Sequence, residues 1–343
     1  MAKYWEIFIN GYTGYAGYLW REITHPAIHN YFYWLIVVSL FFFGMEWIRP
    51  WRENQPRFRK DFWLDFFYMF FNFFLFSLII YNAASDVVVN LFKDLLALGG
   101  ITNLVAIKVQ SWPVWAHLLL GFFVRDFVQW WVHRLLHRVS FLWEFHKVHH
   151  SVEQMGFAAH LRYHWMENVV YRSIEYLPLA LIGIGLNDFF IIHIFTLAIG
   201  HYNHSNITVS GKVSGAVVGG LAGLWIATIN AAALEAASLP VVVSYLLIIA
   251  GGSLAGAFVL GRFMKIIFNS PEMHIWHHAY DIPEDKPYGI NFGISLAIWD
   301  YIFKTDYIPY TGKDIKLGFP GIEKFPHSFI GQNLHGLGPG KEK

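Results

Sequence analysis

Long apolar stretches separated by short polar loops dominate the first third of the chain. They cover residues 31–48, about 66–83 and about 112–132. A helix that crosses the hydrocarbon core of a bilayer needs about 20 mostly apolar residues, and each stretch comes close to that length. We therefore predict that residues 31–132 form transmembrane helices.

The N-terminal segment, residues 1–30, is less regular. It carries Lys3 and the acidic Glu6 and has no continuous apolar core. A cleaved signal peptide would show a basic start followed by an apolar run. We therefore expect this segment to remain on the mature chain.

A further apolar stretch, residues 176–200, is interrupted by Pro178, Gly183 and Gly185. Proline and glycine commonly end or bend helices. The interruptions predict a helical hairpin or a re-entrant pair rather than one straight span.

Residues 208–262 are rich in glycine, alanine and valine and contain two more apolar runs. Two crossings would return the chain to the side from which it came. Gly215, Gly219 and Gly223 are spaced four residues apart, which permits close packing of helices in lipid. A substrate-binding element is one interpretation of this segment, but we favour a simple glycine-rich hairpin.

Basic residues indicate the orientation in the membrane. The loop of residues 49–60, between the first two predicted spans, holds four arginines and one lysine. Short loops with such an excess usually face the cytoplasm. Counting crossings from that loop, the third span delivers His133 to the same side, so we expect a multi-pass protein with its histidines on the cytoplasmic face.

Composition agrees with a membrane location and excludes several classes of site. The chain is 55% hydrophobic and only 14% charged, against about 25% charged residues in ordinary soluble domains. It contains no cysteine, which excludes disulfides, thiolate zinc sites and iron–sulfur clusters. A net charge of +1 argues against a nucleic-acid partner.

Histidines supply the candidate chemistry, since 13 of the 18 lie between His133 and His278. Residues three or four apart share one helix face, so each motif can direct its imidazoles at one point. Neutral imidazole is a common metal ligand, and these eight side chains exceed the four that usually close one zinc site. We therefore predict two metal ions. The motifs are HRLLH (His133, His137), HKVHH (His146, His149, His150) and HIWHH (His274, His277, His278).

Other interpretations of the histidines remain open at this stage. A single such motif is equally typical of a surface helix or a satisfied core histidine. The whole set is compatible with haem ligation, which needs only one or two axial histidines, and with a path for metal transport.

Two charged residues, Arg125 and Asp126, lie within the third predicted span, where charges are costly unless they pair or face the protein interior. Asp126 precedes His133 by seven residues, which places both on one helix face. It is a candidate for orienting a ligand imidazole. An internal ion pair with Arg125 or another neighbour is the alternative.

The ordered motifs DFVQWWVHRLLH, EFHKVHHS, RYHWMEN, YNHSNI, NSPEMHIWHH and YGINFG, followed by WDYIF, resemble the fatty acid hydroxylase and sterol desaturase superfamily over roughly residues 112–305. The resemblance implies an all-α integral membrane protein, in which a transmembrane helical bundle carries a cytosolic, histidine-rich helical cap. In that family the cap holds a di-metal site, usually taken as iron.

The resemblance also assigns residues. The three histidine motifs correspond to the family's ligand boxes, and a further family element matches Arg162, His164 and Glu167, with Trp165 in the place of a proline. It implies that His164 is a ligand, together with His201, His204 or both. Glu167, like Asp126, is then a candidate for imidazole orientation or proton delivery.

On this basis the catalytic cap comprises residues 133–207 and 263–310, separated by the insertion 208–262, which is longer than the corresponding family connection. We expect the C-terminal tail, residues 311–343, to be solvated.

The resemblance implies hydroxylation or desaturation of a lipid C–H bond with dioxygen and two iron ions. Zinc would also bind these ligands in a purified sample, since affinity alone does not favour iron, but it has no redox chemistry. The sequence contains no dinucleotide-binding fingerprint, so reducing equivalents are expected from a separate ferredoxin, cytochrome or reductase. The alternatives are a zinc-dependent membrane hydrolase and a polyhistidine membrane metal transporter or sensor, which would place its ligands along the spans.

Overall fold

The computed structural model describes residues 2–235 and 239–338. The first residue of the predicted N-terminal segment, the tip of the predicted 208–262 insertion and the end of the C-terminal tail lie outside these residues. Throughout the described part the chain is helical, and its only strand-like pairings are two isolated bridges. The all-α prediction is confirmed.

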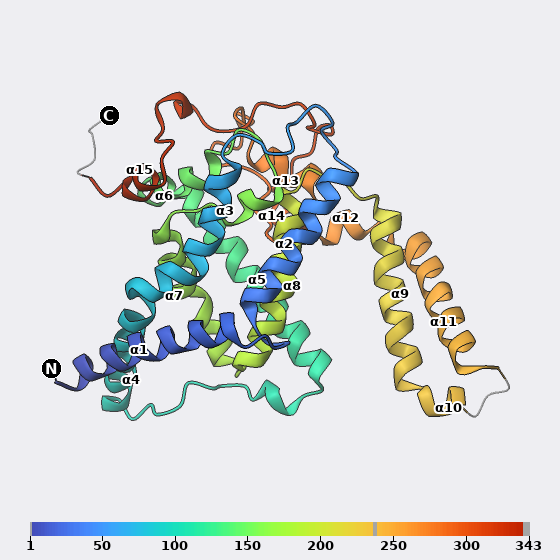
Figure 1. Ribbon diagram of the computed structural model, residues 1–343, viewed down its shortest axis with the longest axis horizontal. Coiled ribbons are helices and arrows are strands. Elements are labelled where there is room, and N and C mark those ends of the chain that lie inside the picture. Colours follow the sequence, from blue (N-terminus) through green and yellow to red (C-terminus); the bar gives the residue numbers. More distant parts are fainter. Residues whose placement is uncertain (1, 236–238, 339–343) are drawn as a thin grey trace.

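Four helical segments of the described chain are long and apolar enough to cross a membrane. Two of them match the first two predicted spans: α2 (Tyr31–Ile48) and the segment Phe62–Ile79. The latter begins as α3 (Phe62–Phe70) and continues through two π-helical turns, η1 (Phe71–Leu75) and η2 (Ser77–Tyr81), into α4 (Asn82–Leu98). The N-terminal helix α1 (Ala2–Thr24) runs crosswise to α2 and α3 and packs against α4 (Figure 1).

A second group of helices is less apolar because it buries polar side chains. It consists of α5 (Val114–Arg138), α7 (Trp165–Leu181) and α8 (Leu186–His204), with the short η3 (Val109–Ser111) before α5. The predicted hairpin is formed by α7 and α8, which are joined by a turn in which Gly183 has a φ of 75°. In that conformation a side chain would be strained.

The other two apolar helices form a hairpin that stands apart from the rest of the molecule (Figure 1). It comprises α9 (Gly211–Ile229), the short α10 (Ala231–Glu235), and α11 (Val241–Ala255), which ends in the π-helical η5 (Gly256–Leu260). The expected glycine contact is present: a Cβ on Gly219 would lie 2.1 Å from the carbonyl oxygen of Gly252. Only glycine permits the two backbones to approach this closely.

Short helices build a cap at one end of the bundle (Figure 1). They are α6 (Ser140–His150), η4 (Phe157–Leu161), α12 (Met264–Ile267), α13 (Pro271–His277), α14 (Ile298–Phe303), η6 (Ile322–Lys324) and α15 (Phe329–Leu334). The basic loop of residues 49–60 lies at this same end, where the backbone N–H of Arg52 donates to the side chain of Asn206 at 2.7 Å. The histidine motifs and the basic loop therefore share one face of the membrane protein.

The described part of the C-terminal tail corrects one expectation. Rather than being solvated, Phe319, Ile322 and Phe325 are buried in a cluster with Tyr68 and Val148. These apolar residues are scattered among glycines and prolines without helical periodicity, so the sequence pattern resembles a loop although the segment packs as core.

Candidate metal centre

Helix ends bring the histidines together. His133 and His137 lie in the last turns of α5, and the HKVHH motif forms the last turn of α6. The third motif occupies α13, which starts with Pro271 at its first position, where a proline costs no hydrogen bond. His204 ends α8. Four separate helices therefore converge on one buried region.

The convergence produces two clusters, in each of which the potential ligand atoms all lie within 4.8 Å of one another. Eight of the nine side chains are buried, and His137 is half-buried. The first cluster contains His133, His137, His146, His150 and His277, and the second contains His149, His204, His274 and His278.

The ring orientations fit metal ligands. In four of the histidines Nδ1 lies 2.8 to 3.0 Å from a backbone carbonyl oxygen, which can only accept a hydrogen bond, so Nδ1 carries the proton and Nε2 presents a lone pair. These four are His133, His149, His204 and His277.

The Nε2 atoms face one another within each cluster. Neighbouring Nε2 atoms are separated by 3.0 to 3.2 Å. Lone pairs at this separation repel unless a cation lies between them, so the donor set fits one metal ion per cluster. Imidazoles alone suit iron, zinc, copper or nickel rather than magnesium or calcium.

Burial keeps these imidazoles uncharged. It lowers the pKa of His149 to about 3, and it lowers the pKa values of His150, His277 and His278 well below that of free histidine. They are therefore neutral near pH 7, which is the form that binds a metal.

Glu167 lies where an orienting carboxylate was expected. Its Oε2 is 2.8 Å from Nδ1 of His146, whose Nε2 faces His133. Glu167 also accepts from the backbone N–H of His164 in a capping box at the start of α7. The helix start thus holds the carboxylate against the first cluster.

Asp126 does not orient a ligand imidazole, which was its predicted role. It accepts hydrogen bonds from the backbone N–H groups of Ser295 and Leu296 and from the indole of Trp299, and among the described residues no imidazole forms a hydrogen bond with it. Nor does it pair with Arg125, which binds Glu175. The loop after the last histidine motif lies between Asp126 and the clusters, and Asp126 anchors that loop.

His164 and His201 lie outside both clusters. His164 is the N-cap of α7, where its Nδ1 accepts from the backbone N–H of Met166 and its Nε2 donates to the carbonyl of Asn333. His201 instead contacts His160, with 2.9 Å between their Nδ1 atoms. Of the two candidates in the HYNH motif, the structure brings only His204 into a cluster.

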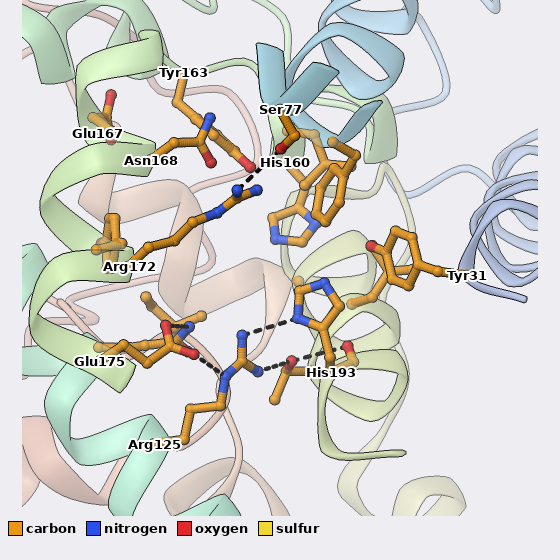
Figure 2. A pocket seen from close by; sticks show the side chains of 18 of the residues that line it. Tyr31, Ser77, Arg125, His160, Tyr163, Glu167, Asn168, Arg172, Glu175 and His193 are labelled. Atoms are coloured by element: carbon orange, nitrogen blue, oxygen red, sulfur yellow. Dashed lines mark hydrogen bonds and ion pairs between the residues drawn. The ribbon is translucent and has the colours of Figure 1, made fainter. Parts of the chain in front are cut away.

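A cavity of about 500 Å³ extends from the clusters into the helical bundle. Its lining includes histidines of both clusters and aromatic side chains of α1 and η1, such as Tyr18 and Phe73. Figure 2 shows a polar wall of this cavity, where Arg125 and Glu175 are joined and Arg172 reaches into the same space.

Sequence reasoning missed this polar wall. A signal was present, because Arg125 and Gln129 are four residues apart and Arg172 and Glu175 three apart. Polar residues at such spacings within apolar helices mark one buried polar face.

Comparisons with known proteins agree with this architecture. Residues 118–229 match the family model described as fatty acid hydroxylase. This match, which covers part of the chain, supports the resemblance to the fatty acid hydroxylase superfamily that the histidine motifs predicted.

One curated relative is the ornithine lipid hydroxylase OlsE of Rhizobium tropici, which is 24% identical over 223 residues. The alignment covers 65% of this chain and 51% of that protein, so the chain spans about half the length of the relative. No solved structure matches the chain.

Proposed function

We propose that this protein is a membrane-bound di-iron oxygenase that hydroxylates a C–H bond of a lipid, using dioxygen and electrons from a separate donor. The observation that carries the proposal is the pair of buried imidazole clusters at the end of a cavity that leads into the membrane-spanning bundle. The family match and the relative named as a lipid hydroxylase support the same reaction class.

The chain's own residues would prepare the site. The nine clustered histidines would hold two iron ions, which supply the activation of dioxygen. Glu167 fixes the ring of His146 through its Nδ1 proton. The loop that contains Phe292 and Gly293 is fixed by Asp300, which accepts from both backbone N–H groups, and Phe292 in turn accepts from His133. This rigid support keeps the ligands in one geometry.

The surroundings favour a lipid substrate and a cytoplasmic metal centre. The cavity starts at the clusters and passes between membrane helices, so an alkyl chain could remain among apolar side chains while its reactive carbon approaches the histidines. The basic loop of residues 49–60 lies at the same end as the clusters, and the charge bias of such loops favours the cytoplasm. A cytoplasmic ferredoxin, cytochrome or reductase would have access to this face.

Lipid mass spectrometry under ¹⁸O₂ tests the proposal. Cells would express the wild type, a His149→Ala, His277→Ala double variant that disables one ligand in each cluster, and a control, His327→Ala, which alters an exposed histidine far from them in sequence. We expect a lipid that gains one labelled oxygen with the wild type and the control only.

Other outcomes would redirect the proposal. A lipid that loses two hydrogens without label would indicate a desaturase. A lipid product without label from dioxygen would indicate a zinc hydrolase, and an unchanged lipid profile with metal-loaded protein and a competent electron donor would favour metal transport or sensing.

A further inference from the structure

Two guanidinium groups line the cavity beneath the clusters, and they differ in how their charge is compensated. Arg125 is fully engaged. Its Nε donates to Glu175 at 2.5 Å, and its terminal nitrogens contact Thr196 and His193. Gln129 donates to the other oxygen of the same carboxylate. This network joins α5, α7 and α8 and has no net charge.

Arg172 has no such partner. Among the residues that the structure describes, no carboxylate lies within 4.0 Å of its guanidinium, and its one hydrogen bond goes to the hydroxyl of Ser77 at 3.0 Å. The guanidinium also lies over the ring of Tyr81, 4.8 Å from the centroid. Figure 2 shows the side chain reaching from α7 into the cavity. These two contacts hold in place a cation that keeps most of its five N–H donors free.

A guanidinium inside a membrane bundle is costly unless an anion accompanies it. Its planar set of donors matches the two oxygens of a carboxylate or phosphate better than any neutral group. We propose that Arg172 binds the oxyanion, carboxylate or phosphate, of an amphipathic lipid substrate. This inference rests on the proposed function and narrows its substrate class to lipids with an acidic head.

The position of Arg172 also limits where such a lipid would react. Arg172 follows Glu167 by five residues on α7, and Glu167 touches His146 of the first cluster. Five residues of helix correspond to about 7.5 Å. Arg172 and Glu167 therefore line the cavity from neighbouring turns of α7, so a lipid anchored at Arg172 would have its polar head, rather than the end of its chain, on the side of Glu167.

Binding of three probes with one acyl chain tests this assignment without turnover. The probes are palmitate, palmitoyl lysophosphatidate and monopalmitoylglycerol, and their dissociation constants would be measured by competition with a tritiated probe on the detergent-solubilised full chain. We expect at least one acidic probe to bind about ten-fold or more tightly than the uncharged one, since a hydrogen bond to a charged group contributes roughly that factor. Preference for palmitate would identify a carboxylate head, and preference for lysophosphatidate a phosphate head.

Substitutions test whether Arg172 causes the preference for acidic probes. Arg172→Gln should abolish it, Arg172→Lys should keep part of it, and Arg138→Gln, which removes an exposed guanidinium outside the cavity lining, should leave it unchanged. Metal content and melting temperature show that each variant is folded. Equal binding of all three probes by the wild type would overturn the inference. It would also be overturned if a folded Arg172→Gln or Arg172→Lys protein gave the same ratios of dissociation constants as the wild type. If a variant fails to fold, the ratio of the wild-type dissociation constants for the acidic and uncharged probes still tests the inference.

The two proposals fail separately. Incorporation of ¹⁸O into a lipid together with equal binding of the probes would leave the hydroxylase and remove the assignment of Arg172. A charge preference that depends on Arg172, in a protein that incorporates no label, would leave an acidic-lipid site and remove the oxygenase.

Discussion

The glycine-packed hairpin of α9 and α11 and the bundle of α5, α7 and α8 use the membrane in opposite ways. The hairpin is largely apolar, and the backbones of its helices are in direct contact, as at Gly219 and Gly252. The bundle encloses guanidinium, carboxylate and imidazole groups around a cavity. The hairpin helices are easy to recognise as spans and contribute no histidine to the clusters, whereas the less apolar α5 and α8 contribute three.

The difference has a physical cause. Lipid solvates the outside of both regions, but only the bundle must also satisfy polar groups inside. Arg125 of α5 pairs there with Glu175 of α7, and this ion pair helps to fix how the two helices are arranged. In the described part of the hairpin, close backbone packing and a cation–π contact between Lys212 and Phe258 join the two helices. The two regions should therefore respond differently to the changes below.

The largest effect should come from removing a ligand. His277→Ala deletes one imidazole of the first cluster, so a metal ion bound there would lack one of its ligands. We expect the number of metal ions bound per folded chain to fall from two to one or fewer, as measured by elemental mass spectrometry. His327→Ala should keep both. Full metal content in folded His277→Ala protein would show that the first cluster does not need His277 as a ligand.

Acid should destabilise the helices that carry the histidine clusters and leave the packing of the hairpin unaffected. Burial lowers the pKa of His149 to about 3, so between pH 6.5 and 3 the unfolded chain binds protons that the folded chain does not. Stability of the metal-free protein should therefore be complete above pH 6.5 and fall as the pH drops towards 3. Hydrogen exchange, corrected for intrinsic rates, should show lost protection in α6 and α13 before α9 and α11. Simultaneous loss in all four would contradict the separation.

Removing the orienting carboxylate should have a smaller effect than removing a ligand. Glu167→Ala leaves Nδ1 of His146 without its acceptor. Loss of such a partner commonly lowers metal affinity by about 10-fold to 100-fold. Competition with a chelator would measure this, and Glu167→Gln, which keeps an acceptor oxygen, should lie between Ala and the wild type. Unchanged affinity in both variants would remove Glu167 from the metal centre.

Disrupting the hairpin should destabilise it without touching the metal. A side chain at Gly219 collides with the backbone of α11, and overpacking of this kind typically costs about 1 to 3 kcal/mol. Gly219→Leu should lower the melting temperature while metal per folded chain stays constant. Gly251→Leu is the matched control, because nothing lies within 4 Å of a Cβ at that position. Loss of metal in Gly219→Leu would show that hairpin packing and the metal centre are coupled.

The smallest effect should come from His164→Ala. This change removes the N-cap of α7 and the bond to Asn333. Loss of a cap usually costs about 0.5 to 2 kcal/mol. Thermal unfolding should show that cost while metal content stays at two ions. Loss of one ion would restore His164 to the ligand set.

The sequence was most informative where one local rule applied. The apolar runs located α2 and the hairpin, and the spacing within each histidine motif placed its side chains on one helix end. The partition of those side chains into two clusters could not be foreseen, because His149 and His150 are adjacent in sequence but belong to different clusters. Neighbours on a helix point about 100° apart, so which centre each one faces depends on how four helices meet.

Tertiary contacts also explain why Asp126 and His164 have other roles than those expected from the sequence. Asp126 lies on the helix face that was expected, yet the loop around Ser295 occupies the space next to it. His164 has the correct residue type and lies near the site, but a carbonyl from the C-terminal segment occupies its Nε2. Contacts between positions more than 160 residues apart leave no trace in a local pattern.

The order of the ligands along the chain has a consequence for biogenesis. Each cluster draws on histidines from both sides of the α9 and α11 hairpin: His277 completes the first, and His274 and His278 complete the second. Under the proposed function, with both hairpin helices crossing the bilayer, metal loading would have to wait until both helices have been synthesised and inserted. A chain whose hairpin crossed the bilayer once instead of twice would leave these three histidines on the opposite side and remain unloaded. Metal occupancy thus reports correct insertion of a segment that contributes no ligand itself.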